Sequence, residues 1–190
     1  MQSRFVHLRV HSEFSLIDGL VRIKPLMKML PDLEMNAVAI TDHSNLFAAV
    51  KIFKSALGAG VKPIIGSDLP VYDLDTPDDI YSMVLLCQNE KGYKNLTRLV
   101  SRAYQEGQSR GEPHVCSAWI EENSEGLIAL SGGAFGDIGK LLLKGKEHEA
   151  LVKAKTWSGI FKARFYLEIQ RTNRSHEVAY NESIVKLAEE

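Results

Sequence analysis

Short apolar runs alternate along the chain with segments whose apolar residues recur at helical spacing. Several runs are continuously apolar, as is typical of strands in a sheet that is covered on both faces. They predict strands at residues 5–10, 37–41, 61–71, 81–87, 126–131 and 165–170. Because strands and helices alternate, we expect an α/β domain with a parallel sheet, either open or closed into a barrel. Its functional residues should lie in the loops after the strands.

Two internal helices are predicted from apolar stripes. The first covers residues 45–57 and ends at Gly58 and Gly60. Its stripe consists of Leu46, Phe47, Val50, Phe53 and Leu57. The second helix follows Asn89, a residue type favoured at the N-cap. Its stripe consists of Tyr93, Leu96, Val100 and Tyr104. We expect both stripes to lie in the core.

A last helix is predicted from about Ser175 through Tyr180, Ile184 and Leu187 to the final residue. No terminating signal follows it, so we expect the chain to be a fragment of a longer protein. With 190 residues, 45% of them apolar and 25% charged, the chain has the size and composition of one globular domain.

Charge and cysteine content narrow the functional classes. Lys and Arg number 23 against 24 acidic residues, and the net charge of −1 disfavours a dedicated DNA-binding module. Cys87 and Cys116 lack the number and spacing of a disulfide framework or a zinc clip, so we expect buried thiols in a reducing compartment. No apolar run approaches the ~20 residues of a membrane span. We therefore expect a cytoplasmic protein without membrane contact.

Histidine and aspartate residues gather where the predicted strands end. His11 and Asp18 follow the first strand. Asp42 and His43 follow the second, and Asp68 lies near the end of the third. Carboxylates crowded together are costly unless a positive charge joins them, and imidazole and carboxylate groups are common ligands of transition metals. The pattern indicates a metal site or an ion-pair network.

An arginine interrupts this pattern. Successive side chains of a strand alternate between faces, so His7, Arg9 and His11 should point the same way. A strand written His-x-His would aim two imidazoles at one ion. The guanidinium of Arg9 has no lone pair to donate to a cation and instead brings a fixed positive charge.

Each member of the cluster has an alternative role. Taken singly, His11 and His43 fit hydrogen-bonded structural histidines, and Asp18-Gly19 fits a turn. Asp42 fits a cap for the helix that starts near residue 45. Taken as a group, these residues favour the site.

Other polar segments receive a structural interpretation. The glycine-rich loop 131–136 precedes a helix but lacks the lysine of a nucleotide-binding loop, which makes it a weak phosphate site. The aspartates at 73, 75, 78 and 79 are expected in a solvated loop, because their spacing does not match a calcium loop. Surface positions are expected for His114, His148 and His176.

Six segments in order resemble a known family: FVHLRVHSEFSLIDGL, AVAITDHSNLF, KPIIGSDLPV, NEKGYKNLTRLVSRAY, EGLIALSGGAFGDIG and FYLEIQRT. They are similar to the N-terminal PHP (polymerase and histidinol phosphatase) domains of bacterial DNA polymerase III alpha subunits, of the proteobacterial type. The resemblance covers residues 1–190 as one domain. It implies a distorted seven-stranded β/α (TIM-like) barrel, here truncated at its C-terminal end and missing its last strands. In members with an intact site it implies up to three zinc or manganese ions.

The resemblance also implies which metal ligands remain. The family ligands at His11, Asp18 and His43 are kept, and Asp68 stands where glutamate is usual. Three positions carry residues that do not ligate well: Arg9 and Ser82 in place of histidines, and Gly133 in place of a ligand that is often cysteine. His7 and Asp42 are expected to support the ligands. The closing Asp-x-His pair would lie beyond residue 190.

These replacements favour loss of the metals, with Arg9 pairing with Asp18, Asp42 or Asp68. No cofactor is expected, and a residual zinc, manganese or magnesium ion is the alternative. The resemblance implies a scaffold that docks the proofreading 3'–5' exonuclease subunit, while the parent alpha subunit binds DNA and synthesises it. No catalytic residue is assigned to this chain, which alone is expected to be inactive.

Two other functions stay open. The first is a metal-dependent phosphoesterase or 3'–5' exonuclease active in proofreading, in which His11, Asp18, His43 and Asp68 hold the metal. The second is a stand-alone phosphatase, which is disfavoured because the NEKGYKNLTRLVSRAY segment matches the polymerase branch of the family.

Overall fold

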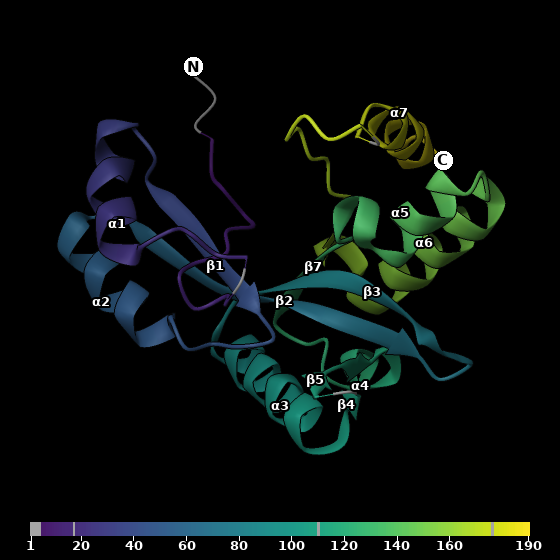
Figure 1. The fold of residues 1–190 in the computed structure, drawn as a ribbon, viewed down its shortest axis with the longest axis horizontal. Helices are drawn as coiled ribbons and strands as arrows, with labels where there is room; N and C mark the ends of the chain where they lie inside the picture. The colour runs from purple at the N-terminus through teal and green to yellow at the C-terminus, as the bar shows by residue number, and fades with distance from the viewer. Residues whose placement is uncertain (1–4, 17, 110, 176) are drawn as a thin grey trace.

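The computed structural model describes residues 5–190 apart from 17, 110 and 176 (Figure 1). Its strands are β1 (Ala37–His43), β2 (Lys62–Asp73), β3 (Thr76–Cys87), β4 (Gln108–Ser109), β5 (Glu112–Pro113), β6 (Val115–Cys116), β7 (Leu127–Leu130) and β8 (Phe165–Tyr166). The α-helices are α1 (Ile23–Asp32), α2 (Ala49–Ala59), α3 (Glu90–Glu106), α4 (Ser117–Glu122), α5 (Asp137–Leu143), α6 (Glu147–Phe161) and α7 (Glu177–Ala188). Two short 3-10 turns are η1 (Gly133–Phe135) and η2 (Lys162–Arg164).

The main sheet is mixed and open. Its strand order is β1-β2-β3-β7-β8, with β6 paired to β2. The pairs β1–β2 and β7–β8 are parallel, whereas β3 runs antiparallel to both of its neighbours. The α/β class is confirmed, but the all-parallel sheet is wrong and the seven-stranded barrel is not confirmed by the described residues. A tight β2–β3 hairpin reverses the chain, and a continuous apolar run carries no information on strand direction.

Helices cover the sheet in two groups. Figure 1 shows α1 and α2 at one end of the molecule and α5, α6 and α7 at the other. One core cluster joins α1, α2 and β1 and includes Ile23, Leu30 and Ile52. The larger cluster joins α3, α6 and α7 to β2, β3 and β7, and its centre includes Leu96 and Phe161. The sheet therefore links two cores, with the predicted site residues on its strands and loops between them.

Two of the predicted strands are shorter or less regular than expected. Residues 5–10 form one isolated bridge, between His7 and Val38, and not a continuous strand. The segment still runs beside β1, because the N–H of Ala39 donates to the carbonyl of His7 at 2.8 Å and that of Thr41 to Val10 at 2.9 Å. The strand predicted at 165–170 is regular only in β8. The acidic run predicted as a loop instead forms the tip of the β2–β3 hairpin, with an exposed turn between the strands.

The apolar stripe of the first predicted helix is not in the core. Helix α2 begins at Ala49 rather than near residue 45, and it buries Ile52 and Ala56. Four members of the stripe are instead largely exposed: Phe47 (70%), Val50 (66%), Phe53 (52%) and Leu57 (63%). The prediction was wrong because the face of α2 that carries Ile52 and Ala56 packs inward, which leaves the predicted stripe outside. The predicted end is confirmed, since Gly60 caps the helix in the left-handed conformation.

The other two helices follow the pattern more closely. Asn89 caps α3 by accepting a hydrogen bond from the N–H of Gly92 at 3.0 Å. Leu96 of the α3 stripe is buried, whereas Tyr93 and Tyr104 at its edges are 43% exposed. In α7 the predicted stripe is buried and consists of Tyr180, Ile184 and Leu187.

Cysteine and histidine positions are mostly as expected. Cys116 is buried, Cys87 is partly buried, and both are free thiols. His148 is exposed, but His114 is buried, so the surface prediction for His114 was wrong. His176 lies outside the described residues. Within the described part of the chain, no helix combines the length and the apolar character that crossing a bilayer requires.

Gly92 in α3 lies in close contact with a neighbouring turn, and Gly58 in α2 serves as an open comparison. A Cβ atom at Gly92 would lie 1.8 Å from the carbonyl oxygen of Gly126, whereas one at Gly58 meets nothing within 4 Å. We expect Gly92→Ala to destabilise the fold by about 1–3 kcal/mol through overpacking. Gly58→Ala should stabilise it by about 0.5–1 kcal/mol through lost backbone entropy. Urea unfolding of both variants measures the difference, and equal effects would contradict the close approach of α3 to the Gly126 turn.

Candidate metal centre and the adjoining ion-pair network

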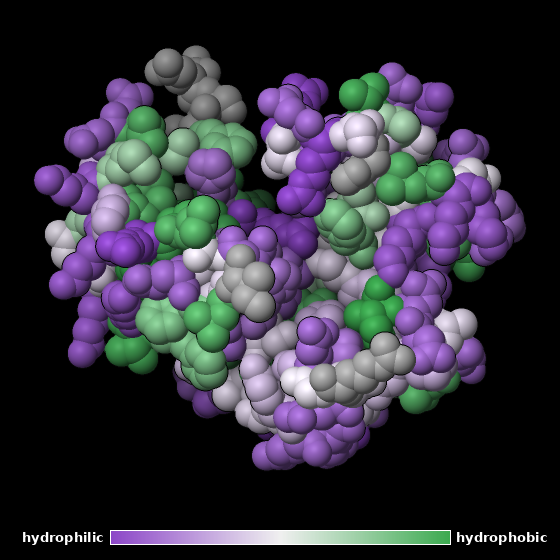
Figure 2. All heavy atoms as spheres, viewed as in Figure 1, coloured by the Kyte–Doolittle hydropathy of each residue, from purple (hydrophilic) through white to green (hydrophobic). Residues whose placement is uncertain are grey.

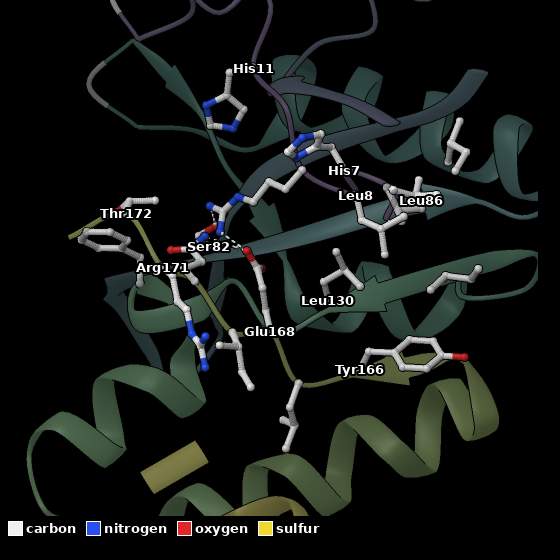
Figure 3. Close-up of a pocket in the computed structure, with 18 of the residues that line it drawn as sticks. His7, Leu8, His11, Ser82, Leu86, Leu130, Tyr166, Glu168, Arg171 and Thr172 are labelled. Atoms are coloured by element: carbon white, nitrogen blue, oxygen red, sulfur yellow. Dashed lines mark hydrogen bonds and ion pairs between the residues drawn. The ribbon is translucent and has the colours of Figure 1, made fainter. Parts of the chain in front are cut away.

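The predicted site residues lie at the polar end of one cavity of about 1000 Å³. The cavity is bounded by the N-terminal segment, the sheet and the segment that follows β8 (Figure 3). Its polar wall contains Arg9, His11, Asp18, His43 and Ser82. The rest of the wall includes apolar side chains of the sheet, such as Ile64, Leu86, Ile128 and Leu130.

Arg9 is held by three neighbours. Its Nε and Nη2 donate to Asp68 Oδ2 at 3.0 and 2.6 Å. Its Nη1 donates to Glu168 Oε1 at 3.0 Å, and Nη2 also donates to Ser82 Oγ at 3.1 Å. These partners come from β2, from β3 and from the segment after β8. One guanidinium thus joins its own segment to three other parts of the chain, and Figure 3 shows Ser82 and Glu168 among the residues around the cavity.

Asp68 is the centre of the network. Its side chain is only 1% exposed, and it also accepts a hydrogen bond from Ser82 at 2.6 Å and contacts His11 Nε2 at 3.0 Å. Burial alone would raise the pKa of Asp68, but the hydrogen bonds from His11 and Ser82 and the charge of Arg9 lower it to about 2. A carboxyl group with a lowered pKa stabilises the fold above its unfolded pKa, and this contribution is lost as the pH falls toward 2.

His11, Asp18 and His43 form a second group beside the first. Asp18 Oδ2 lies 2.5 Å from His11 Nδ1 and 3.4 Å from His43 Nε2, and the two imidazole centroids are 4.2 Å apart. Burial would lower the pKa of His11, but its hydrogen bonds to Asp68 and Asp18 raise it above the usual value. The hydrogen bond to His11 lowers the pKa of Asp18. One potential ligand atom from each of the three residues lies within 4.8 Å of the others, which fits a single metal ion.

Asp42 orders the loop that carries these ligands. It accepts hydrogen bonds from the N–H and Oγ of Ser12 at 2.6 and 2.8 Å, and from Ser15 Oγ at 2.7 Å. The alternative role of Asp42 as a cap for α2 was wrong, because residue 48 is the N-cap and lacks a side-chain hydrogen bond. His7 lines the cavity but makes its ring contact with Phe5.

A side chain at Gly133 would be strained by the backbone conformation and would crowd a neighbouring side chain. Gly133 has a left-handed φ of +62°, and a Cβ built there would lie 3.1 Å from the side-chain amide of Gln170. Gln170 in turn donates from Nε2 to Glu168 Oε1 at 2.6 Å. Gly133 therefore packs against Gln170 of the segment after β8, and Gln170 in turn binds Glu168, the partner of Arg9.

Glu168 is the functional residue that the sequence patterns missed. It follows β8 in the FYLEIQRT segment, and its side chain is 11% exposed. The predicted strand at residues 165–170 included Glu168, so the feature that identified Asp18 and Asp42, an acidic residue after a strand, did not apply to it. Of the three predicted partners of Arg9, only Asp68 contacts it, whereas Asp18 and Asp42 bind other groups.

The family follows from a comparison of the sequence with family models. The model described as PHP domain matches residues 7–172, so the chain belongs to the PHP domain family. It is similar to the DNA polymerase III subunit alpha of Pseudomonas aeruginosa, with 47% identity over 99% of this chain, and to that of Escherichia coli K12, with 44% identity over 99%. The chain spans 16% of the length of these relatives and is homologous to their N-terminal region.

Solved structures share the fold at low sequence identity. A protein from Bifidobacterium adolescentis, described as a metal-dependent phosphoesterase, superposes with a TM-score of 0.59 at 12% identity, over 98% of this chain and 84% of that one. An amidohydrolase from Chromobacterium violaceum, with bound sulfate and no metal, gives 0.56 at 15% identity, over 96% and 81% of the two chains. At these identities the likeness shows the fold alone.

Removing the guanidinium tests the network. We expect Arg9→Met to lower the free energy of unfolding by about 3 kcal/mol, because Asp68 and Glu168 are left as buried charges without their partner. The loss should shrink in acid as Asp68, whose pKa the network lowers to about 2, becomes protonated. Urea titrations at several pH values measure both effects. Lys155→Met, which removes an exposed charge from α6, is the control, and a similar small loss in both variants would contradict the role of Arg9.

Proposed function

We propose that this PHP domain is a structural scaffold of a cytoplasmic DNA polymerase III alpha subunit and docks the proofreading 3'–5' exonuclease subunit. DNA synthesis would belong to the rest of the alpha subunit. The observation that carries the proposal is the ion pairing of Arg9 with Asp68 and Glu168, where the family places metal ligands. The distorted seven-stranded barrel also remains a proposal, supported by the way Arg9 and Glu168 join the N-terminal segment to the segment after β8.

Charge favours the network over a multi-metal site. At a separation of about 4 Å and an effective dielectric near 20, like charges repel by roughly 4 kcal/mol per unit pair. Asp68, the carboxylate closest to Arg9, already accepts hydrogen bonds from Arg9 and Ser82 and contacts His11. A second or third ion would therefore have to displace the guanidinium.

A single-metal phosphoesterase is the second candidate, favoured by the grouping of His11, Asp18 and His43. Two imidazoles and a carboxylate are a donor set that suits zinc or manganese. When bound, such an ion would supply a water of lowered pKa. His11, Asp18 and His43 would then hold the ion. Asp68 would orient the imidazole of His11 through its contact with Nε2, and Arg9 would hold Asp68 in place.

Metal content distinguishes the two candidates. We expect the protein, after incubation with zinc or manganese and dialysis, to retain far less than one ion per chain by elemental analysis. The reason is the fixed charge of Arg9 beside the remaining ligands. Arg9→His should retain more metal, because it restores a ligand and removes the repulsion. Stoichiometric metal in the unmodified protein would refute the scaffold assignment and favour the phosphoesterase.

The docking part of the proposal rests on α2. Phe47, Val50, Phe53 and Leu57 expose between 52% and 70% of their surface on or just before this helix. Figure 2 shows hydrophobic residues on the end of the molecule formed by α1 and α2, with hydrophilic residues around them. Exposed apolar patches with a polar rim mark protein interaction sites. Lys54 on the same helix would favour an acidic surface on the exonuclease subunit, whereas Lys51 is already paired with Glu13.

Serine substitutions test this face. We expect Phe47→Ser with Phe53→Ser to weaken binding of the exonuclease subunit roughly 30-fold, the effect of losing a hot spot of about 2 kcal/mol. Both side chains are mainly exposed, so stability should change little. The control is Val152→Ser, at a residue 53% exposed on α6. Isothermal titration with the exonuclease subunit gives the affinities, and unchanged binding by the double variant would place the docking surface elsewhere.

A further inference from the structure

Two arginines stand at the rim of the cavity in the loop after β8. Arg171 and Arg174 both line the cavity and are exposed. Within residues 5–190, leaving out the three undescribed positions, neither forms an ion pair with a carboxylate. This contrasts with Arg9, whose charge is compensated by Asp68 and Glu168. The rim therefore carries positive charge that the network does not neutralise.

Helix α7 holds this loop in one conformation. Glu177 Oε2 accepts a hydrogen bond from the N–H of Thr172 at 2.7 Å, and Glu177 Oε1 accepts one from Thr172 Oγ1. Tyr180 Oη donates to the carbonyl of Glu168 at 2.6 Å, and Asn181 Nδ2 donates to that of Gln170 at 2.9 Å. Three side chains of one helix thus anchor the backbone on which the arginines stand. Such support reduces the entropy lost when a ligand binds.

The turn between the two arginines is also defined. Asn173 has a left-handed φ of +64°, a conformation that asparagine tolerates better than most residues. Arg171 and Thr172 lie along one side of the cavity (Figure 3). In the space-filling view the loop forms a hydrophilic edge beside the hollow between the two ends of the molecule (Figure 2).

An aromatic ring accompanies the arginines. Phe135, in η1 after β7, is 47% exposed, and the guanidinium of Arg174 lies 5.8 Å from its ring centroid. Exposed aromatic rings beside guanidinium groups are the usual means of binding single-stranded nucleic acid, because bases stack on the ring while arginines pair with phosphates. The arginines could thus pair with a phosphate while Phe135 stacks on a base at the same rim of the cavity.

The position of this rim agrees with a binding role. Strands β1, β7 and β8 point in the same direction, so the loops with His43, Phe135 and Arg171 lie at the same end of the sheet. In α/β folds this is the end at which ligands bind. The net charge of −1 averages over the whole surface and does not describe this local excess of positive charge.

We propose that Arg171, Arg174 and Phe135 bind a single-stranded nucleic acid through its phosphates and one base, without a metal ion and without cleaving it. The site goes beyond the proposed scaffold function, because it lies on the loops after β7 and β8 and not on α2. A nucleic acid is favoured over an acidic protein segment because carboxylates would use the arginines but not the exposed ring.

The test is fluorescence anisotropy of the protein with a labelled oligothymidylate of roughly ten nucleotides, in the presence of a chelator. Contact with two phosphates gives a log–log salt slope of about −1.4, so the dissociation constant should rise about sevenfold between about 50 and 200 mM salt. Arg171→Gln with Arg174→Gln should weaken binding by at least that factor and flatten the slope. Phe135→Leu should weaken it about fivefold or more without changing the slope.

Matched variants separate binding from folding. Lys155→Gln removes one exposed charge on α6 and should leave the affinity unchanged. Arg174→Lys keeps the charge, so the slope of log Kd against log salt should stay close to that of the unmodified protein. Far-UV circular dichroism of every variant confirms the fold, since the substituted side chains are exposed.

Three results would overturn the proposal. The first is unchanged affinity in the double arginine variant. The second is equal competition by a polyglutamate peptide of the same length, which would assign the rim to an acidic protein segment. The third is displacement of the oligonucleotide by inorganic phosphate at an equal phosphate concentration, which would assign it to a free anion. None of these results depends on whether the α2 face binds the exonuclease subunit.

Discussion

The ion pair between Arg9 and Asp68 is the interaction on which the polar centre of this protein depends. A carboxylate that is 1% exposed must be compensated, and the guanidinium does so while it also reaches Glu168 and Ser82. The resemblance to the family implies that metal ions would serve this purpose where the site is intact. Here an arginine performs that cross-linking, and the histidines beside it are left with one carboxylate of their own, Asp18.

Much of the fold could be predicted from the sequence, because apolar runs and capping residues report on local structure. Strands β1, β2, β3 and β7 and the cap at Asn89 are where the patterns place them. The direction of β3 was not predictable, since a buried strand has the same composition in either orientation. The exposure of Phe53 and Leu57 was also missed, because amphipathic spacing identifies an apolar face but not what covers it.

The site was predictable to the extent that strand ends converge. His11, Asp18, His43 and Asp68 meet as expected, since the parallel pairing of β1 with β2 brings His43 opposite Asp68. The partner of Arg9 after β8 was not found, because it lies 159 residues away along the chain and no local pattern records such a contact. Burial explains the pairing: the guanidinium of Arg9 lies inside the cavity and pairs with Asp68 and Glu168, two carboxylates that water barely reaches.

The separation of Arg9 and Glu168 along the chain has a consequence for synthesis on the ribosome. Arg9 is synthesised before both of its carboxylate partners, since Asp68 follows it by 59 residues and Glu168 by 159. The network can be complete only after the later of the two has been added. At about 5–20 residues per second this interval lasts roughly ten to thirty seconds. During it, Arg9 can pair with Asp68 but not with Glu168. The contact that joins the segment beside β1 to the segment after β8 is thus among the last of the domain to form.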